Sequence, residues 1–414
     1  MTKNKNLRKN FLWNTIGSTL YAFTSLIFLI AVTRINGLED AGVFTFAFSN
    51  ACVFVIIGTF AGRIFQVTEK EGRVTENDFF YNRLLSIGVM ALLGAVFGVL
   101  KGYDGYKFAV VFVLILFKAL EAMAEFYYGV IQKKDEIHCV GKSLTAKAIL
   151  SVSVFIGVDI ATKNILLASI AMTLAMLLVM ALYDIRISRK LGFKRGKLNL
   201  DACLAIFKSG CLVFVINILT QYLINAPKYA IDDLASSDQQ TLYGIIAMPA
   251  TFMVLVSNFM VHPVINQIKS YIEKKNRVGL NKLVAKLNLI VIAVGALGSI
   301  AGYFLAVPIF KLIYGVDVSG YEWSLVLILI GASFYGIVFI IENVLIALRE
   351  TIGQAVAFAI AAVSAFLLTR ALVAGEAISG GAKAYIIVMS LLLVLYGVLY
   401  YSALEKRISG GRKK

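Results

Sequence analysis

Charged residues are scarce in this chain of 414 residues. They make up 15% of the composition, whereas soluble domains carry about a quarter. Hydrophobic residues make up 59%, and the mean hydropathy is +0.83. This balance excludes a string of ordinary soluble domains and predicts a protein of the lipid bilayer.

Cysteine and histidine are rare too. His138 and His262 stand without a cysteine or carboxylate at ligand spacing, so we expect no metal site. His262 precedes Pro263 and is expected to mark a bend in a helix. The cysteines are scattered, which predicts buried thiols rather than disulfides: Cys52, Cys139, Cys203 and Cys211.

Motifs for nucleotide chemistry are also lacking. The tetrapeptide "VGKS" at 140–143 is similar to the end of a phosphate-binding loop, but Glu136 occupies the place of the required first glycine. No outer loop is long enough to form the catalytic loop of a membrane-bound glycosyl transferase or polymerase. We therefore expect no cofactor and no enzymatic activity.

Long apolar runs, by contrast, recur along the whole chain. A hydrocarbon core of about 30 Å needs about 20 apolar residues per helix. We expect an all-α integral membrane protein with twelve transmembrane helices, and eleven or thirteen are the alternatives. The expected spans are 11–33, 41–62, 84–100, 108–131, 143–160, 163–185, 202–224, 241–266, 284–312, 323–348, 350–373 and 382–404.

The net charge of +16 follows the expected topology. If the N-terminus is cytoplasmic, most of the 40 lysines and arginines fall on the inner side, as the positive-inside rule requires. Both termini are thus expected in the cytoplasm, and the basic composition needs no nucleic-acid partner. Lys147, Lys208 and Lys286 lie near the inner ends of spans and are expected to extend to the membrane surface.

The most basic stretch, residues 186–201, falls halfway through the expected spans. We expect an N-terminal six-helix bundle at 1–190, a cytoplasmic linker at 191–201 and a C-terminal six-helix bundle at 202–414. Two bundles that both enter from the cytoplasm are related by a pseudo-two-fold axis along the membrane normal, as in transporters with parallel repeats.

Charged residues interrupt the fourth span. An advance of about 100° per residue places its polar side chains on one stripe, within an arc of about 80°: Lys118, Glu121, Glu125 and Tyr128. Because charges facing lipid are costly, the stripe faces protein or water. Either Lys118 pairs with Glu121 and locks two helices together, or the stripe lines a cavity where Glu121 and Glu125 take up a proton or a cation.

Other polar residues favour a hydrated interior. Asn14 and Ser18 share a face of the first span, and Asn217, Gln221, Asn225 and Lys228 share a face of the seventh. Hydrogen bonding between helices is the alternative explanation. Glu342 is a further deep carboxylate, in the tenth span, and we group it with Glu121 and Glu125 as a candidate for ion coupling.

Three stretches of the sequence look familiar: "RINGLEDAGVFTFAFSNA" (34–51), "FKALEAMAEFYYGVIQKKDEIHCVGKSLTAKAIL" (117–150) and "NAPKYAIDDLASSDQQTLYGIIAMPATF" (225–252). They resemble the Wzx-type polysaccharide flippases of the multidrug/oligosaccharidyl-lipid/polysaccharide exporter superfamily. The resemblance extends over nearly the whole chain in span number and topology, and it is most specific in the fourth span.

This resemblance implies two six-helix bundles around a cleft that opens alternately to each side of a bacterial cytoplasmic membrane. It implies transport of undecaprenyl-pyrophosphate-linked oligosaccharide for capsule, O-antigen or another surface glycan, driven by an ion gradient, with H⁺ or Na⁺ as the coupling ion, or by the membrane potential. The implied partners are that lipid-linked oligosaccharide, membrane lipids and the polysaccharide polymerase machinery. In such proteins cations of the cavity contact the pyrophosphate, and the candidates here are Lys118, Arg34 and Lys228. Arg34 and Lys228 stand at helix ends, so anchoring of the protein at the outer surface is the alternative for these two.

Two functions remain open at this point. The first is the flippase, and the second is an ion-coupled antiporter of drugs or small metabolites from the same superfamily. The antiporter predicts drug resistance on overexpression and a compact acidic pocket, whereas the flippase predicts that loss of the gene strands a lipid-linked sugar inside the cell.

Overall fold

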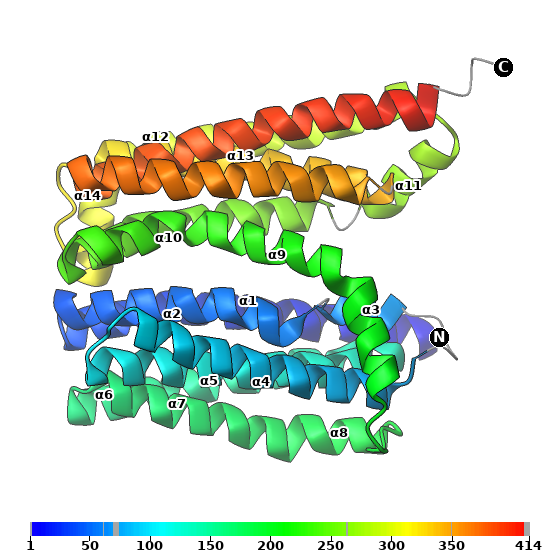
Figure 1. The fold of residues 1–414 in the computed structure, drawn as a ribbon, viewed down its shortest axis with the longest axis horizontal. Helices are drawn as coiled ribbons and strands as arrows, with labels where there is room; N and C mark the ends of the chain where they lie inside the picture. The colour runs from blue at the N-terminus through cyan, green and yellow to red at the C-terminus, as the bar shows by residue number, and fades with distance from the viewer. Residues whose placement is uncertain (1, 61, 69–73, 262–263, 349, 410–414) are drawn as a thin grey trace. The chain divides into compact units, whose positions relative to one another are not determined.

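The fold is known from a computed structural model that describes residues 2–60, 62–68, 74–261, 264–348 and 350–409 (Figure 1). All regular structure in these residues is helical. The chain divides into two compact units, Met1–Ile218 and Leu219–Lys414. The predicted bundle boundaries and the linker at 191–201 remain predictions, as does the bend at His262 and Pro263, which lies outside the described residues.

The first unit contains eight α-helices, the start of a ninth and one π-helical turn among its described residues. They are α1 (Thr2–Ile35), α2 (Leu38–Thr59), α3 (Gly62–Thr68), α4 (Glu76–Leu100), α5 (Gly105–Lys133), α6 (Ile137–Thr162), α7 (Ile165–Val179), the π-helical turn η1 (Met180–Asp184), α8 (Ile185–Lys190) and α9 (Leu200–Leu234). Helix α9 continues across the unit boundary.

The second unit contains the end of α9 and five further helices with a π-helical end, again counted over the described residues. They are α10 (Ser237–Val261), α11 (Ile265–Glu273), α12 (Arg277–Tyr314), α13 (Glu322–Ala347), α14 (Thr351–Leu404) and the turn η3 (Glu405–Ser409). Helix α13 packs against α10, α12 and α14, as α5 packs against α2, α4 and α7 in the first unit.

Ten helices in the described residues are long and apolar enough to cross a membrane, which makes this an all-α multi-pass membrane protein. Helix α5 has the length of a span but is not among the ten, because it carries Lys118, Glu121 and Glu125. Helix α14 counts as one, although Ala377 inside it has non-helical angles (φ 47°, ψ −116°).

At Ala377 the chain folds back on itself. The ring of Phe358, before Ala377, contacts the ring of Tyr396, after it, with centroids 5.6 Å apart. The Tyr396 hydroxyl donates to Gln354 Oε1 at 3.4 Å. Since these residues are nearly equidistant from Ala377, the two halves of α14 run antiparallel.

Helix ends extend beyond the predicted spans. Helix α4 begins at Glu76 rather than 84 because Thr75 caps it: the Thr75 hydroxyl accepts from the Asp78 backbone N–H at 3.3 Å, and Asp78 accepts from the Thr75 N–H at 2.8 Å. Helix α12 starts at Arg277 rather than 284 and continues to Tyr314, where Gly315 caps it with φ of 76°.

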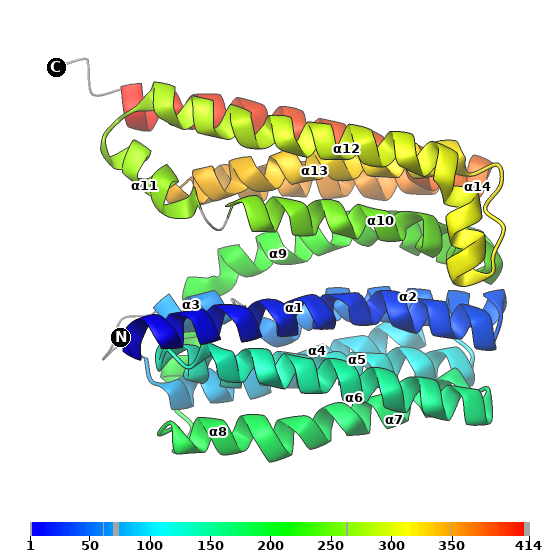
Figure 2. The same cartoon turned by 180° about the vertical axis from the view of Figure 1, so that it is seen from behind.

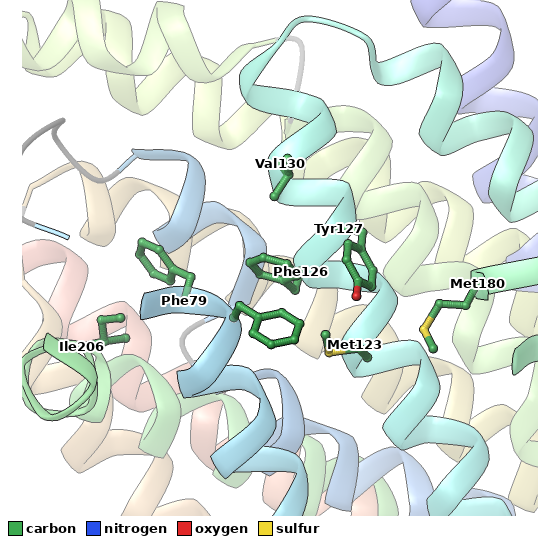
Figure 3. Close-up of a cluster of buried hydrophobic side chains, with 8 residues drawn as sticks. Phe79, Met123, Phe126, Tyr127, Val130, Met180 and Ile206 are labelled. Carbon is green, nitrogen blue, oxygen red and sulfur yellow. The ribbon is translucent and has the colours of Figure 1, made fainter. Parts of the chain in front are cut away.

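The apolar core of the first unit lies where α4, α5, η1 and α9 meet. Phe79 and Phe80 of α4 pack against Phe126 and Tyr127 of α5, and Met180 of η1 joins them (Figure 3). This packing holds α5 in place, so that the charged stripe takes a fixed direction within the unit.

Helices α1 and α6 run side by side (Figure 2) and approach closely at two glycines. A Cβ atom on Gly17 would overlap the carbonyl oxygen of Gly141, and one on Gly141 would overlap the carbonyl oxygen of Trp13. Only glycine allows the two backbones to lie this near each other.

Candidate functional site

Helix α5 carries the polar side chains that interrupt the apolar interior of the first unit. Its N-cap, Asp104, accepts from the backbone N–H groups of Tyr106 and Lys107 at 2.9 Å each, which fixes the start of the helix. Apolar residues of α5 contact α2, α4 and α7, and the polar stripe meets α1 and α3. The stripe divides into three groups.

The first group is centred on the Glu121 carboxylate. Lys118 Nζ donates to Glu121 Oε2 at 2.7 Å, and the hydroxyl of Tyr21 on α1 donates to the same oxygen at 2.8 Å. The Lys118 side chain is 9% exposed and that of Glu121 is 25% exposed. The predicted pair within α5 therefore exists, and Tyr21 extends it to a neighbouring helix.

Aromatic rings surround the Lys118 ammonium on its other side. Its Nζ lies 5.0 Å from the centroid of the Phe48 ring and 5.9 Å from that of Phe117. Rings at this distance stabilise a cation that has lost most of its water. Lys118 is thus held by one carboxylate and two rings.

The second group joins α5 to α3. Arg63 Nε lies 3.5 Å from Glu125 Oε2, and both side chains are about a third exposed, at 32% and 30%. Arg83 is buried in α4 and donates from Nη1 to the Gly58 carbonyl at 3.0 Å. Its Nε has no hydrogen-bond partner among the described residues. Apolar periodicity gave no signal for these two arginines.

The third group contains Tyr128, which the sequence placed on the cavity stripe. Tyr128 is instead buried against α6 and η1. Its hydroxyl lies 3.0 Å from Ser143 Oγ and accepts from Lys147 Nζ at 2.8 Å. Tyr128 therefore has a separate environment from Lys118 and Glu121.

The expectation for Lys147 was wrong. Rather than reaching the membrane surface, Lys147 is fully buried, and its Nζ donates to Asp184 Oδ2 at 2.5 Å. Ser143 Oγ donates to the other oxygen of Asp184 at 2.6 Å. The π-helical turn places Asp184 at this point, and π-helical turns often occur at functional sites. The sequence does not indicate which carboxylate meets Lys147.

The remaining predicted residues of the first unit lie on α1 and α9. Asn14 is half-buried, whereas Ser18 and Arg34 are exposed. Asn217 on α9 is half-buried. The role of these residues stays a prediction.

In the second unit, Glu342 lies half-buried on α13. In the most apolar stretch of this helix, 78% of the residues are buried. Its carboxylate has no cation partner among the described residues, and the nearby polar groups include Tyr335 and Tyr396. On α9, buried Asn225 donates to the Gln221 carbonyl at 3.0 Å, while Gln221 and Lys228 are half-buried.

The statement that His138 stands without a cysteine or carboxylate at ligand spacing was also wrong. Glu136, His138 and Cys139 do lie close together, with one potential metal ligand of each within 4.8 Å of the others. The spacing Glu-x-His-Cys at the end of a loop could have indicated this group. His262 lies outside the described residues.

Comparison with known proteins identifies one distant relative and several structures with the same fold. No family model matches the sequence. A curated relative, the capsular polysaccharide biosynthesis protein CapF of Staphylococcus aureus, is 21% identical over 344 residues, or 81% of this chain and 83% of the relative. This chain is therefore a distant homologue of a protein named for capsule biosynthesis.

Several solved transporters share the fold. An inward-facing multidrug resistance MATE family transporter of the MOP superfamily is 10% identical and has a TM-score of 0.69. The alignment covers 98% of this chain and 99% of the transporter chain. The lipid II flippase MurJ has a TM-score of 0.66 at 15% identity, and the alignment covers 96% of this chain and 90% of MurJ. The Vibrio cholerae MATE transporter VcmN has 0.63 at 15% identity, with 98% of both chains covered. The chain thus has the MOP-superfamily fold.

Proposed function

We propose that this protein moves lipid-linked oligosaccharide repeat units, carried on undecaprenyl pyrophosphate, from the cytoplasmic to the outer leaflet. The observation that carries the proposal is the match to CapF over four fifths of both chains, combined with a transporter fold that the flippase MurJ shares. The products would serve capsule, O-antigen or another surface polysaccharide, and the Wzx-type flippases are the group that fits best.

The proposed architecture has twelve spans in two six-helix bundles. To the ten apolar helices we add α5, which is long enough but charged, and we divide α14 at Ala377. The 54 residues of α14 would extend about 80 Å as one helix, far more than a bilayer core of about 30 Å. Twelve spans put both termini on the same side of the membrane, and the positive-inside rule favours the cytoplasmic side.

The physical task supports a polar lining. A sugar pyrophosphate cannot cross hydrocarbon unaided, because each unsatisfied polar group there costs several kcal/mol. We propose that Lys118, with Arg34 and Lys228, meets the phosphate charge, and that polar residues hydrate the path: Asn14, Ser18, Asn217, Gln221 and Asn225. Tyr128 is buried in the Lys147 group, so its part is to support α5 rather than to contact substrate.

The candidate coupling groups are not equivalent. Glu121 already accepts from Lys118 and Tyr21, and Glu125 is paired with Arg63. Glu342, in the described part of the chain, has no cation partner. We therefore propose that Glu342 carries the coupling H⁺ or Na⁺, and that Glu121 and Glu125 exchange their partners during the transport cycle.

An ion-coupled antiporter of drugs or small metabolites is the second candidate. The observation that favours it is the similarity to multidrug transporters, one of which has a TM-score of 0.69, above the 0.66 of MurJ. Overexpression separates the two: resistance to cationic drugs supports the antiporter, and unchanged susceptibility supports the flippase.

Deletion of the gene tests the flippase directly. We expect lipid-linked oligosaccharide to accumulate in the inner leaflet, and the wild-type gene to restore the normal pool. An unchanged pool of lipid-linked sugar, in cells that still assemble their surface polysaccharide, would exclude the proposal.

A further inference from the structure

A group of metal-binding side chains lies where the loop after α5 enters α6. Glu136 ends the loop, and His138 and Cys139 stand in the first turn of α6. The Cys139 sulfur lies 3.6 Å from His138 Nε2. Two ligands of a tetrahedral zinc ion, one nitrogen and one sulfur, are separated by about 3.6 Å, given Zn–N near 2.05 Å and Zn–S near 2.3 Å.

The protonation of His138 follows from its neighbour Asn10 on α1. Asn10 Nδ2 donates to the Asp135 carbonyl at 2.7 Å, so Asn10 Oδ1 is directed at His138. That oxygen accepts from the His138 backbone N–H at 3.0 Å and lies 3.1 Å from Nδ1. Nδ1 therefore carries the proton, and Nε2, on the side of Cys139, keeps its lone pair for a metal.

Glu136 can supply a third ligand. Its Oε2 lies 3.2 Å from His138 Nδ1, and its side chain is 39% exposed. Because Asn10 already accepts from Nδ1, Glu136 can turn towards a metal without leaving that proton unpaired. The nearby cation Lys142 is directed elsewhere, with its Nζ 5.4 Å from the Trp13 ring centroid.

We propose that Glu136, His138 and Cys139 bind a zinc ion or a similarly soft divalent cation, with Asn10 orienting the histidine. The Cys139 thiol loses its proton to solvent as the metal–sulfur bond forms, and water completes the tetrahedron. The bound ion ties the α5–α6 loop, and through Asn10 the start of α1, to α6. The site is independent of the substrate that the protein carries.

Cobalt titration tests the site on the full-length protein, purified in detergent without a polyhistidine tag. We expect one Co²⁺ per chain, thiolate-to-cobalt charge-transfer absorption, and its loss when Zn²⁺ is added. Cys139→Ser should abolish the absorption, His138→Gln should weaken binding at least tenfold, and Asn10→Ala should weaken it about 10-fold to 100-fold. Cys211→Ser, which removes an exposed thiol far along the chain, should change nothing.

Alkylation gives a second readout. In a variant whose only cysteine is Cys139, bound Zn²⁺ should slow the reaction with a maleimide, and His138→Gln should remove that protection. Absence of charge-transfer absorption in the folded wild type, or the same absorption in Cys139→Ser, would overturn the site.

Discussion

Two lysines lie inside the apolar interior of the first unit, and each is paired with a carboxylate. Lys118 meets Glu121 one turn further along its own helix, whereas Lys147 meets Asp184 from a different helix. The first pair could be predicted from the sequence, because helical spacing alone brings residues i and i+3 together. The second depends on packing between helices, and periodicity does not report it.

Removal of one partner of the buried Lys147–Asp184 pair should destabilise the protein. Lys147→Met leaves a buried carboxylate without its cation, and we expect a loss of about 3–5 kcal/mol. The double variant Lys147→Met/Asp184→Leu should recover most of that loss. Thermal unfolding of the purified variants measures both. A double variant no more stable than Lys147→Met would show that the pair is not the source of the effect.

Glu121 should matter for transport more than its hydrogen-bonding neighbour. Glu121→Gln leaves Lys118 without a counter-charge, so we expect a large loss of transport, whereas Tyr21→Phe removes one hydrogen bond worth about 0.5–1.5 kcal/mol. Glu39→Gln, at an exposed position on α2, is the matched control. Transport of lipid-linked oligosaccharide and its dependence on ion gradients are the measurements, and wild-type behaviour of Glu121→Gln in both would contradict the proposed exchange of partners at Glu121.

Water access separates a lining role from a structural one. Single cysteines at positions 118, 121, 217 and 221, in an otherwise cysteine-free and active protein, should react with a water-soluble maleimide at some of these positions. Protection at all four would leave helix packing as the function of these polar residues.

At the scale of elements, the sequence predicts the existence of the helices well and the residues at which they begin and end less well. Hydropathy locates the apolar part of α4, but the helix starts where Thr75 and Asp78 cap it. The fold-back of α14 lies within the gap expected between the spans 350–373 and 382–404, but the sequence did not indicate Ala377 itself, since it is neither a glycine nor a proline. Local capping and backbone turns outside the apolar runs explain these differences.

The contact between α1 and α6 gives an element-scale prediction. Gly141→Ala would place a Cβ atom on the Trp13 carbonyl, so the helices must separate, at a cost of about 1–3 kcal/mol. Gly157→Ala on the same helix meets nothing within 4 Å and should raise stability by about 0.4–1 kcal/mol. The melting temperatures of the two variants compare them directly. Equal effects would mean that α1 and α6 do not approach at Gly141.

At the scale of the whole molecule, composition and charge bias predict an all-helical membrane protein, and the quoted stretches indicate the fold that it shares with an exporter superfamily. The similarity to MATE transporters and MurJ confirms the fold. Helix α5 has its tertiary partners on segments that are far apart in the sequence. They are Tyr21, Arg63 and the buried residues around Asp184. A single sequence holds no direct signal for such contacts.

Twelve spans predict that the fold-back of α14 and the loop between α11 and α12 lie on opposite sides of the membrane. In an otherwise cysteine-free protein, Ala374→Cys beside the fold-back of α14 should be labelled from outside intact cells. Lys274→Cys, exposed between α11 and α12, should be labelled only after the membrane is opened. Labelling of both from the same side would exclude the division of α14 into two spans.

The central claim is that this protein carries lipid-linked oligosaccharide across a bilayer, and reconstitution tests it most directly. Purified protein is placed in vesicles that contain the lipid-linked oligosaccharide in both leaflets, and a membrane-impermeant glycosidase is added outside. We predict that the enzyme consumes the whole pool in vesicles with protein and only the outer-leaflet fraction in vesicles without it. Consumption limited to the outer leaflet in both, with the protein folded and an ion gradient imposed, would contradict the claim.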